Sequence, residues 1–369
     1  MKIVIITSSA KALFNLRKEL VAHWVDNGHD VTAIGDGQED IFIPLCKAAG
    51  YKYRQVSLSR NGVNPMTDYK TFREIKKILE EIKPDRVLCT FAKAVSYGCW
   101  AAKVAGIEDT YAMVSGLGSI FRGNSIKNKL IRVVLKGLYK NAFKGCRKVI
   151  FHNDDDCNGL VGMGLLPAEK GVVVNGSGVD LKRFAEQPLP GNKTFLFIGR
   201  LLKEKGVREF LEASRAVKNL YPQARFMAVG DTDTNPSSLT QEEIETYKTD
   251  NVVEFFGFKE DVRPYLEQAD IFVFPSYHEG RPRCVLEAMS MGRPVITTTV
   301  PGCRDTVSEG VNGFLVPVGD TELLKKRMIE LLENPALAQK MGTAARKIAE
   351  ETYDVDKVNA RIAEIMQLL

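Results

Sequence analysis

Residues 274–302 read FPSYHEGRPRCVLEAMSMGRPVITTTVPG, and their pattern is the strongest indication of the fold in this sequence. An apolar run at residues 271–274 precedes this stretch and predicts a buried strand. A loop follows, then a short helix over residues 283–291 and a second buried strand at residues 295–298. This strand–loop–helix–strand order is typical of a parallel α/β sheet.

Two carboxylates, Glu279 and Glu287, lie on either side of the predicted start of this helix. The amino end of a helix carries unpaired N–H groups and a positive dipole end, so it favours anions. Ionised carboxylates accept strong hydrogen bonds from sugar hydroxyls. The loop therefore suits a ligand that combines phosphate and sugar, although two solvated glutamates beside an ordinary loop would give the same spacing.

A second stretch, TFLFIGRLLKEKG at residues 194–206, carries fixed positive charge. Its apolar strand ends at Gly199, and Arg200 and Lys205 follow at the carboxyl end, where open α/β sheets bind ligands. Two cations there can neutralise a departing diphosphate without a metal ion. Two surface basic residues flanking a turn are the simpler alternative.

Taken together, GRLLKEKG, PSYHEGRPRCVLEAMSMGRPVI and the later NGFLVP resemble the retaining glycosyltransferases of family four. The resemblance implies the GT-B fold, with two Rossmann-like doubly wound domains facing across a cleft. It also implies that Arg200 and Lys205 hold the donor diphosphate, that Glu279 contacts the transferred sugar, and that Glu287 contacts the nucleoside ribose. The donor-binding set that it implies is Gly199, Arg200, Lys205, Phe258, Glu279, Gly280, Arg281, Pro282, Cys284, Val285, Glu287 and Gly302, with Arg200, Lys205 and Glu279 catalytic.

Strands and helices alternate along the whole chain, which predicts two parallel doubly wound sheets. The earlier strands are expected at residues 2–7, 31–34, 54–56, 87–90, 111–114, 149–152 and 172–174, with a helix over 14–27. The glycine-rich segment 175–180 reads as the hinge. We expect an acceptor-binding domain over residues 1–184, a donor-binding domain over 185–354, and a last helix, 355–369, that packs back on the first domain.

The composition, with 44% hydrophobic and 26% charged residues, is that of a soluble globular protein. The seven cysteines show no CxxC pair, so neither a disulfide framework nor a zinc site is expected, and a reducing cytoplasm fits. The start, MKIVIITSSA, reads as a first strand rather than a signal peptide. No apolar run approaches the length of a membrane span.

Positive charge is concentrated in residues 122–148, which contain nine Lys or Arg residues and no Asp or Glu. Apolar residues alternate with the basic ones at helical spacing, so this segment predicts a basic amphipathic helix that suits an anionic membrane surface. An ordinary domain helix with a solvated basic face is the alternative. The residues expected to contact the membrane are Lys127, Lys129, Arg132, Lys136 and Lys140.

Acceptor contacts are expected at three strand ends of the first domain. Ser9 follows the first strand, and Lys93 follows the strand at 87–90, where it either binds an acceptor phosphate or is simply solvated. The loop VSGLGSIFRG resembles a loop of polyprenyl-diphosphate-sugar transferases, which implies Gly116, Gly118 and Ser119 as acceptor residues. Arg17 also resembles an arginine of those enzymes, but we expect an exposed helix arginine.

Two DxD patterns, at 154–156 and 231–233, have local explanations as helix capping and as a loop. We therefore expect no metal and no cofactor, and no nucleic-acid partner, because no recognition motif accompanies the basic residues. The sequence favours a cytoplasmic, peripheral membrane transferase that moves a hexose or N-acetylhexosamine from a UDP-sugar to a polyprenyl-diphosphate-linked sugar. A transferase with a soluble acceptor, a UDP-sugar epimerase and a non-catalytic sugar-nucleotide-binding protein are the alternatives.

Overall fold

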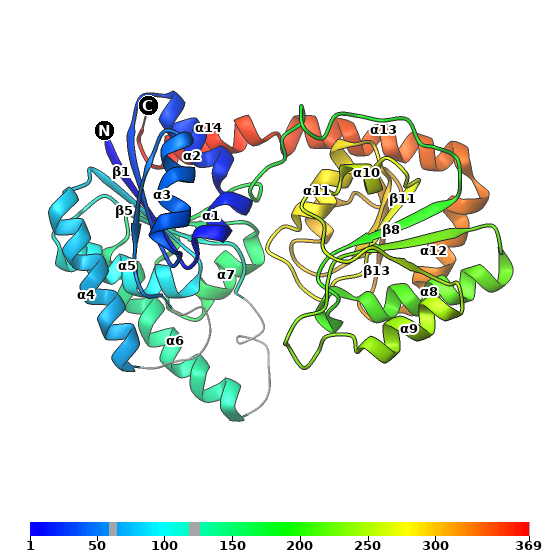
Figure 1. The fold of residues 1–369 in the computed structure, drawn as a ribbon, viewed down its shortest axis with the longest axis horizontal. Coiled ribbons are helices and arrows are strands. Elements are labelled where there is room, and N and C mark those ends of the chain that lie inside the picture. Colours follow the sequence, from blue (N-terminus) through cyan, green and yellow to red (C-terminus); the bar gives the residue numbers. More distant parts are fainter. Residues whose placement is uncertain (59–64, 118–125, 369) are drawn as a thin grey trace. The chain divides into compact units, whose positions relative to one another are not determined.

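The computed structural model describes residues 1–58, 65–117 and 126–368, and for residues 126–131 it describes the backbone only. The described chain forms two compact units (Figure 1). Unit 1 comprises Met1–Ser177 and Asp356–Leu369, and unit 2 comprises Gly178–Val355. The chain therefore passes between the units twice, at residues 177–178 and 355–356, whereas the sequence placed the crossings at 184–185 and 354–355.

Unit 1 contains a seven-stranded sheet in the order β3-β2-β1-β4-β5-β6-β7, with every neighbouring pair parallel. This is the doubly wound arrangement that the alternation of strands and helices predicted. The strands are β1 Lys2–Thr7, β2 Asp30–Gly35, β3 Lys52–Gln55, β4 Arg86–Thr90, β5 Thr110–Val114, β6 Lys148–Phe151 and β7 Gly171–Val173.

Helices cover both faces of this sheet, and the period of two along each strand decides which core a side chain joins. Val4 and Ile6 of β1 point into a core shared with α4, α5, α6 and α7, while Ile3 and Ile5 point into a core shared with α1, α2 and α14. The helix α5 packs between α4 and α6. The unit 1 helices are α1 Ala10–Leu16, α2 Lys18–Asp26, α3 Glu39–Ala48, α4 Pro65–Ile82, α5 Ala92–Val104, α6 Ile126–Gly145, α7 Asp154–Gly162 and α14 Val355–Ile365.

The single helix expected over residues 14–27 is in fact two helices, because Arg17 leaves the helical conformation between α1 and α2 with φ −136° and ψ 4°. The side chain of Arg17 is buried, with 3% of its surface exposed, so the expectation of an exposed arginine was wrong. Its guanidinium donates to the hydroxyls of Ser115 and Ser177, both at 2.7 Å. The break between α1 and α2 therefore coincides with a buried arginine whose two hydrogen-bond partners lie far from it in the sequence.

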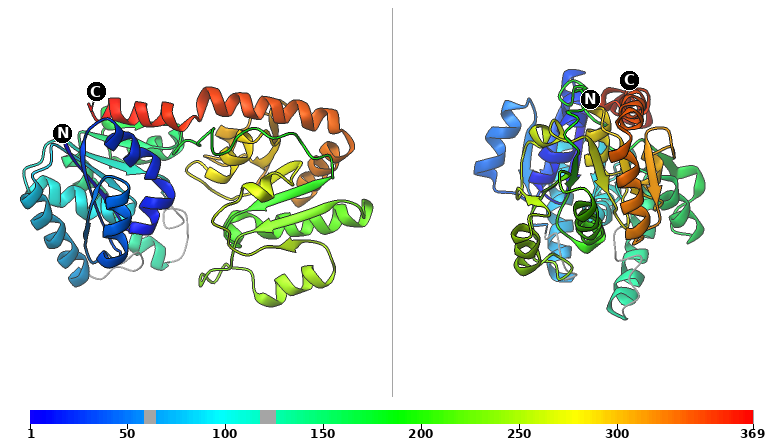
Figure 2. Two further views of the ribbon diagram at one scale, coloured as in Figure 1. Left: turned by 45° about the horizontal axis from the view of Figure 1, so that its top comes forward. Right: turned by 90° about the vertical axis from the view of Figure 1, so that its right-hand side faces the viewer.

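The C-terminal helix α14 belongs to the core of unit 1. Five of its side chains or those just after it are buried there: Val358, Ile362, Ala363, Met366 and Leu368. The carbonyl of Met366 also accepts hydrogen bonds from Arg86 Nε at 3.0 Å and from Tyr111 Oη at 3.3 Å. Unit 1 is therefore completed by residues that follow the whole of unit 2 in the sequence (Figure 2).

Unit 2 contains a six-stranded parallel sheet in the order β10-β9-β8-β11-β12-β13. The strands are β8 Thr194–Ile198, β9 Arg225–Val229, β10 Glu254–Phe255, β11 Ile271–Phe274, β12 Val295–Thr298 and β13 Gly313–Val316. β13 was not among the strands expected from the sequence. Gly313 begins this edge strand with φ +157°, and a Cβ there would lie 1.8 Å from the Val295 carbonyl oxygen.

Figure 1 shows α11 and α13 on one side of the unit 2 sheet and α8 on the other. The pairs α11–α13 and α8–α12 pack against each other, and together they enclose one apolar core. Within the described residues, no helix is both long enough and apolar enough to span a bilayer. The helices of unit 2 are α8 Val207–Leu220, α9 Gln241–Thr249, α10 Arg263–Leu266, α11 Arg283–Ser290, α12 Thr321–Glu333 and α13 Pro335–Thr352.

Candidate active site

The candidate site lies in unit 2 where the strand order reverses. β8 is the first strand of this sheet, and the chain adds β9 on one side and later β11 on the other. In open α/β sheets, ligands bind at such a switch point, beyond the carboxyl ends of the strands. Arg200 and Lys205 follow β8, and Glu279 follows β11, so the topology brings the two predicted stretches to one place.

The cation of Lys205 and the carboxylate of Glu279 form the centre of this site. Lys205 Nζ donates to Glu279 Oε1 at 2.5 Å, and the two side chains are only 22% and 14% exposed. The Ser276 hydroxyl donates to the same carboxylate oxygen at 2.9 Å. Burial alone would lower the pKa of Lys205, but the charge and hydrogen bond of Glu279 raise it above its ordinary value, so the lysine is cationic at neutral pH.

The loop that carries both cations is held between two neighbouring loops. The Glu204 carbonyl accepts hydrogen bonds from the Tyr277 N–H and the Ser276 hydroxyl, both at 3.0 Å, and this fixes it against the segment after β11. On its other side, the Lys203 N–H donates to the Ser237 carbonyl at 2.9 Å. Gly206 ends the loop with φ +73°, and a Cβ there would lie 1.9 Å from the Pro275 carbonyl oxygen, so only glycine fits.

Arg200 lies on the more open side of the site, with 60% of its side chain exposed. Its Nη1 donates to Asp233 Oδ2 at 2.7 Å, and this hydrogen bond lowers the pKa of the Asp233 carboxyl below its ordinary value. Gly199 lies directly before it, where a Cβ would approach the Phe274 ring to 3.3 Å. Phe258, which follows β10, is 62% exposed.

The predicted helix at residues 283–291 is α11, which begins after Pro282 as its N-cap. Gly280, Pro282 and Val285 are buried around this helix start. Glu287 accepts a hydrogen bond from Arg283 Nε at 3.2 Å, one turn earlier, so both of the predicted carboxylates pair with a cation. Burial raises the pKa of the Cys284 thiol well above its ordinary value, so the thiol stays neutral beside them.

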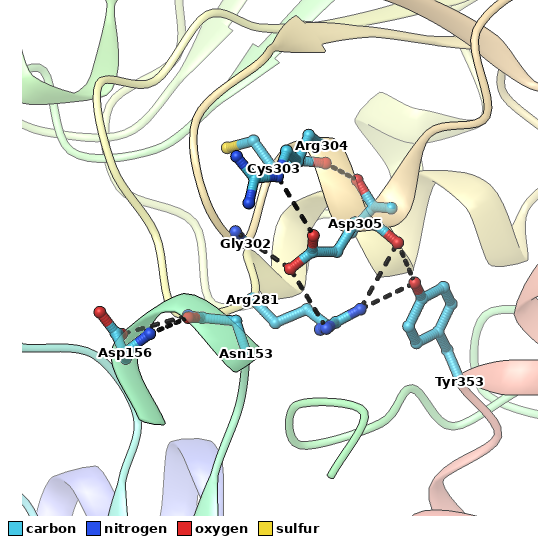
Figure 3. Close-up of polar contacts among 9 residues, drawn as sticks. Asn153, Asp156, Arg281, Gly302, Cys303, Arg304, Asp305 and Tyr353 are labelled. Atoms are coloured by element: carbon cyan, nitrogen blue, oxygen red, sulfur yellow. Dashed lines mark hydrogen bonds and ion pairs between the residues drawn. The ribbon is translucent and has the colours of Figure 1, made fainter. Parts of the chain in front are cut away.

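A polar network anchors the loop between Glu279 and α11 (Figure 3). Arg281, whose side chain is 6% exposed, donates to Tyr353 Oη at 2.9 Å and pairs with Asp305 Oδ2 at 3.4 Å. The same Asp305 oxygen accepts from the Gly302 N–H at 3.2 Å. Gly302 has φ +78°, and a Cβ there would lie 2.4 Å from the Glu279 carbonyl oxygen. The loop after β11 therefore lies directly against the segment after β12.

Ser9 and Lys93, two of the predicted acceptor residues of unit 1, follow β1 and β4, which flank the switch point of its sheet. Ser9 is the N-cap of α1, with extended φ and ψ, and among the described residues its side chain makes no cap hydrogen bond. Lys93, in the first turn of α5, pairs with Asp68 Oδ1 at 2.9 Å, so it is more than a solvated lysine. Gly116 has φ +150° in the loop after β5, whereas Gly118 and Ser119 lie outside the described residues.

Of the five residues expected to contact a membrane, Lys127 and Lys129 lie outside the side chains that the structure describes. Arg132, Lys136 and Lys140 are described, and all three belong to α6. Val133 and Val134 of the same helix expose 68% and 44% of their surface. This part of α6 therefore presents basic and apolar side chains together.

Among the residues that the structure describes, no three or more His, Cys, Asp or Glu side chains gather in a way that could hold a metal ion. The aspartates at 154–156 form the first turn of α7, whose N-cap Asn153 accepts the Asp156 N–H at 2.8 Å (Figure 3). All seven cysteines are free thiols.

Several residues of the site had no assigned role at the level of sequence: Ser276, Asp233, Asp305 and Tyr353. At the level of sequence, Asp233 is only part of the DxD pattern at 231–233. Tyr353 is distant in sequence from the other members and carries no local signal. A polar residue that contacts the site from a remote element becomes visible only when the fold is known.

The family models agree with this architecture. Residues 179–348 match the model of glycosyl transferases group 1, and residues 12–153 match a glycosyl transferase 4-like model. One match lies within each unit. The match in unit 2 includes β8 and β11, the strands on either side of its switch point. Both matches are to glycosyl transferase models, and the chain is a glycosyltransferase, an enzyme that transfers a glycosyl group.

Two individual glycosyltransferases are similar to this chain over most of its length. The chain is 28% identical over 379 residues to an N,N'-diacetylbacillosaminyl-diphospho-undecaprenol alpha-1,3-N-acetylgalactosaminyltransferase of Campylobacter jejuni, with 99% of this chain and 98% of the relative covered. It is 29% identical over 322 residues to a UDP-Gal:alpha-D-GlcNAc-diphosphoundecaprenol alpha-1,3-galactosyltransferase of Escherichia coli, with 82% and 80% covered.

Solved structures share the fold. The Anabaena protein HepE, crystallised with UDP and glucose, superposes with a TM-score of 0.82 at 20% identity, over 100% of both chains. A sucrose-phosphate synthase from Thermosynechococcus elongatus gives a TM-score of 0.81 at 17% identity, over 100% of this chain and 99% of the other. These neighbours confirm the predicted GT-B fold, in which two Rossmann-like domains follow each other in one chain.

Proposed function

We propose that this enzyme is a retaining, metal-independent glycosyltransferase that moves a hexose or N-acetylhexosamine from a UDP-sugar to a polyprenyl-diphosphate-linked sugar. The donor binds at the switch point of unit 2, and the acceptor binds at the carboxyl edge of unit 1. The product is a longer lipid-linked glycan for bacterial polysaccharide assembly.

The observation that carries this proposal is the half-buried pair of Lys205 and Glu279 beyond the ends of β8 and β11, with Arg200 on the open side. The cations match the two phosphates of a nucleoside diphosphate, and the carboxylate accepts hydrogen bonds from sugar hydroxyls. Phosphate and sugar are bonded to each other in a nucleotide sugar. A site with both binding groups a few ångströms apart fits such a donor.

The acceptor class is supported by the relatives, whose names give acceptors linked to diphospho-undecaprenol. One of these names also gives UDP-Gal as the donor. The match to the Campylobacter jejuni enzyme extends over almost all of both chains, so it includes the acceptor half as well as the donor half.

In the reaction, the acceptor hydroxyl attacks the anomeric carbon on the face from which UDP leaves. The bond between the anomeric carbon and the phosphate oxygen breaks as the new glycosidic bond forms, and a β-phosphate oxygen takes the acceptor proton. Lys205, Arg200 and the backbone N–H groups at the start of α11 stabilise the charge that develops on the diphosphate. Glu279 orients the sugar, Glu287 binds the ribose, and no metal ion is required.

We further propose that α6 holds the enzyme on the cytoplasmic face of the membrane, where its lipid-linked acceptor lies. Arg132, Lys136 and Lys140 would attract anionic headgroups while Val133 and Val134 enter the interface. Exchange of the three basic residues for Gln should abolish co-flotation with phosphatidylglycerol vesicles and preserve transfer to a short-chain acceptor in detergent. Unchanged flotation would contradict this role.

The transferase proposal is tested by UDP release from UDP-GalNAc, UDP-GlcNAc, UDP-Gal and UDP-Glc, each with and without a polyprenyl-diphosphate-sugar acceptor and with EDTA present. We expect release from one donor that depends on the acceptor and resists the chelator. Conversion of a donor without any acceptor would indicate an epimerase instead. Release that EDTA abolishes would contradict metal independence.

A further inference from the structure

Three groups of the predicted donor-binding set share one feature in this structure, which is that each donates a hydrogen bond to a carboxylate. Lys205 donates to Glu279, Arg200 to Asp233, and the Gly302 N–H to Asp305. A carboxylate and a phosphate are both anionic oxygen acceptors, so they compete for the same donors. Donor binding at these groups therefore involves an exchange of one anion for another.

The Lys205–Glu279 and Arg200–Asp233 pairs differ in how easily the cation can leave its carboxylate for a phosphate. Glu279 is 14% exposed, receives a second hydrogen bond from Ser276, and has a proposed role toward the sugar. Asp233 and Arg200 are 30% and 60% exposed, and their pair borders solvent. An exposed ion pair contributes little to stability, so Arg200 can leave Asp233 at small cost.

Asp233 itself remains in place when Arg200 moves, because its own loop holds it. Its Oδ1 accepts from the Asn235 N–H at 3.3 Å, and its N–H donates to the Ser238 hydroxyl at 3.0 Å. Ser238 in turn donates to the Leu201 carbonyl at 3.2 Å, next to Arg200. The Asp233 carboxylate is thus a fixed negative charge beside the position of the donor diphosphate.

We propose that Asp233 is an internal competitor of the nucleoside diphosphate for the Arg200 guanidinium, and that it thereby weakens binding of the UDP product and speeds its release. This inference rests on the proposed function, because it takes UDP as the ligand of Arg200. It assigns Asp233 a positioning role, in which it acts through Arg200 rather than on the substrate.

The Asp233 carboxylate has two opposing effects on diphosphate binding. Holding Arg200 in one exposed geometry helps the diphosphate little, since the pair is weak and the side chain is long. The like charge of Asp233 acts on the diphosphate itself, and repulsion between charges a few ångströms apart is not removed by salt at physiological strength. Repulsion outweighs positioning, and product release is often the slow step of such enzymes.

The test is the dissociation constant of UDP, measured by isothermal titration calorimetry on the full chain. Asp233→Asn keeps the size and the oxygen that accepts the Asn235 N–H but removes the charge. The matched control is Asp231→Asn, which removes the same charge two residues earlier, where the side chain accepts the Thr232 N–H at 2.9 Å. Arg200→Ala and the double variant with Asp233→Asn complete a cycle.

We expect Asp233→Asn to bind UDP about threefold to fivefold more tightly, as the loss of one exposed charge interaction implies. Asp231→Asn should change the constant less than about twofold, and Asp233→Asn should have no comparable effect in the Arg200→Ala background. The inhibition constant of UDP as a product should fall in parallel.

Three outcomes would overturn the inference. Weaker or unchanged UDP binding by Asp233→Asn shows that Asp233 positions Arg200 or has no role. Equal tightening by Asp231→Asn shows a general charge effect. The same tightening without Arg200 shows that the competition does not concern the guanidinium. Absence of UDP binding by the unmodified chain would instead contradict the proposed function, so the two failures can be told apart.

Discussion

Glu279 is central to the site, because it pairs with the Lys205 cation and has a proposed role in orienting the sugar. It accepts hydrogen bonds from both Lys205 and Ser276, so its carboxylate has a fixed position before any sugar is bound. A group that is already oriented contributes more to a transition state than one that must be ordered during the reaction. The two predicted carboxylates should therefore differ in their effects on turnover.

We predict that Glu279→Gln lowers kcat by about 10²-fold to 10³-fold, because the oriented negative charge toward the sugar is lost. Glu287→Gln, the matched control one helix turn into α11, should mainly raise the KM for the donor. Steady-state kinetics over a range of donor concentrations separates the two effects. A Glu279→Gln enzyme with nearly normal kcat would contradict the assigned role.

The ion pair of Lys205 also predicts a pH dependence. The pKa of Lys205 is raised above its ordinary 10.5, so the pair stabilises the folded state fully below that pH and loses its contribution as the pH rises through the folded-state pKa. The difference in unfolding free energy between the unmodified enzyme and Lys205→Met should stay constant from neutral pH up to that point and then decrease. Urea titrations at a series of pH values measure it, and a decrease beginning near neutral pH would refute the prediction.

At the scale of elements, the site depends on close approach of the loops after β11 and β12. Gly302 has φ +78°, and a Cβ added to it would lie 2.4 and 2.5 Å from the carbonyl oxygens of Glu279 and Gly280, so no side chain fits without moving the loop that carries Glu279. Gly310 has nearly the same conformation, φ +74°, but a Cβ there would have no described atom within 4 Å. Substitutions at Gly302 and Gly310 should therefore cause similar backbone strain, but only the one at Gly302 should also displace the loop that carries Glu279.

We predict that Gly302→Ala lowers kcat/KM for the donor by at least about tenfold, because a shift of the catalytic loop of this size is expected to cost that much or more. Gly310→Ala should show only the backbone strain, as a loss of about 1 kcal/mol in stability, with kcat/KM nearly unchanged. Similar kcat/KM values for the two variants would show that the loop does not depend on this contact.

The elements also show what the sequence can and cannot predict. β1, β11 and β12 were predicted with the bounds observed, because a buried strand of a parallel sheet is a continuous apolar run between turn residues. The break at Arg17 and the strand β13 were missed. Arg17 is held by hydroxyls at residues 115 and 177, which no local pattern reveals. β13 is a short edge strand that begins with a glycine, so its local strand signal is weak.

Some residues of the candidate site could likewise be predicted from the sequence, and others could not. Arg200, Lys205 and Glu279 could be selected from sequence, because each follows an apolar strand and parallel strands end at one edge of a sheet. Their partners could not be selected. The pairs of Arg200 with Asp233 and of Arg281 with Tyr353 join residues on separate elements, and only the folded chain shows them.

At the scale of the whole molecule, the chain folds as two units of which one is discontinuous in sequence. Ile362 of α14 is buried in unit 1, with 1% exposed, and Leu331 of α12 is equally buried in unit 2. A large buried side chain truncated to alanine costs about 2–5 kcal/mol of folding stability. The two positions are therefore matched reporters of the two units.

We predict that Ile362→Ala destabilises unit 1 by about 2–5 kcal/mol and leaves unit 2 unchanged, while Leu331→Ala does the reverse. Tryptophan fluorescence reports unit 1, because both tryptophans, Trp24 and Trp100, lie there, and far-UV circular dichroism reports both units. Equal shifts of the fluorescence transition by the two variants would show that the units unfold as one.

The measurement that tests the central claim most directly is transfer of labelled sugar from its UDP donor to a polyprenyl-diphosphate-sugar acceptor, with EDTA present, by the unmodified enzyme and by Lys205→Ala. We predict acceptor-dependent product from the unmodified enzyme and a rate at least about 10²-fold lower from Lys205→Ala, since one stabilising cation at the leaving diphosphate is lost. A Lys205→Ala enzyme that transfers at nearly the normal rate would contradict the role of this cation in catalysis.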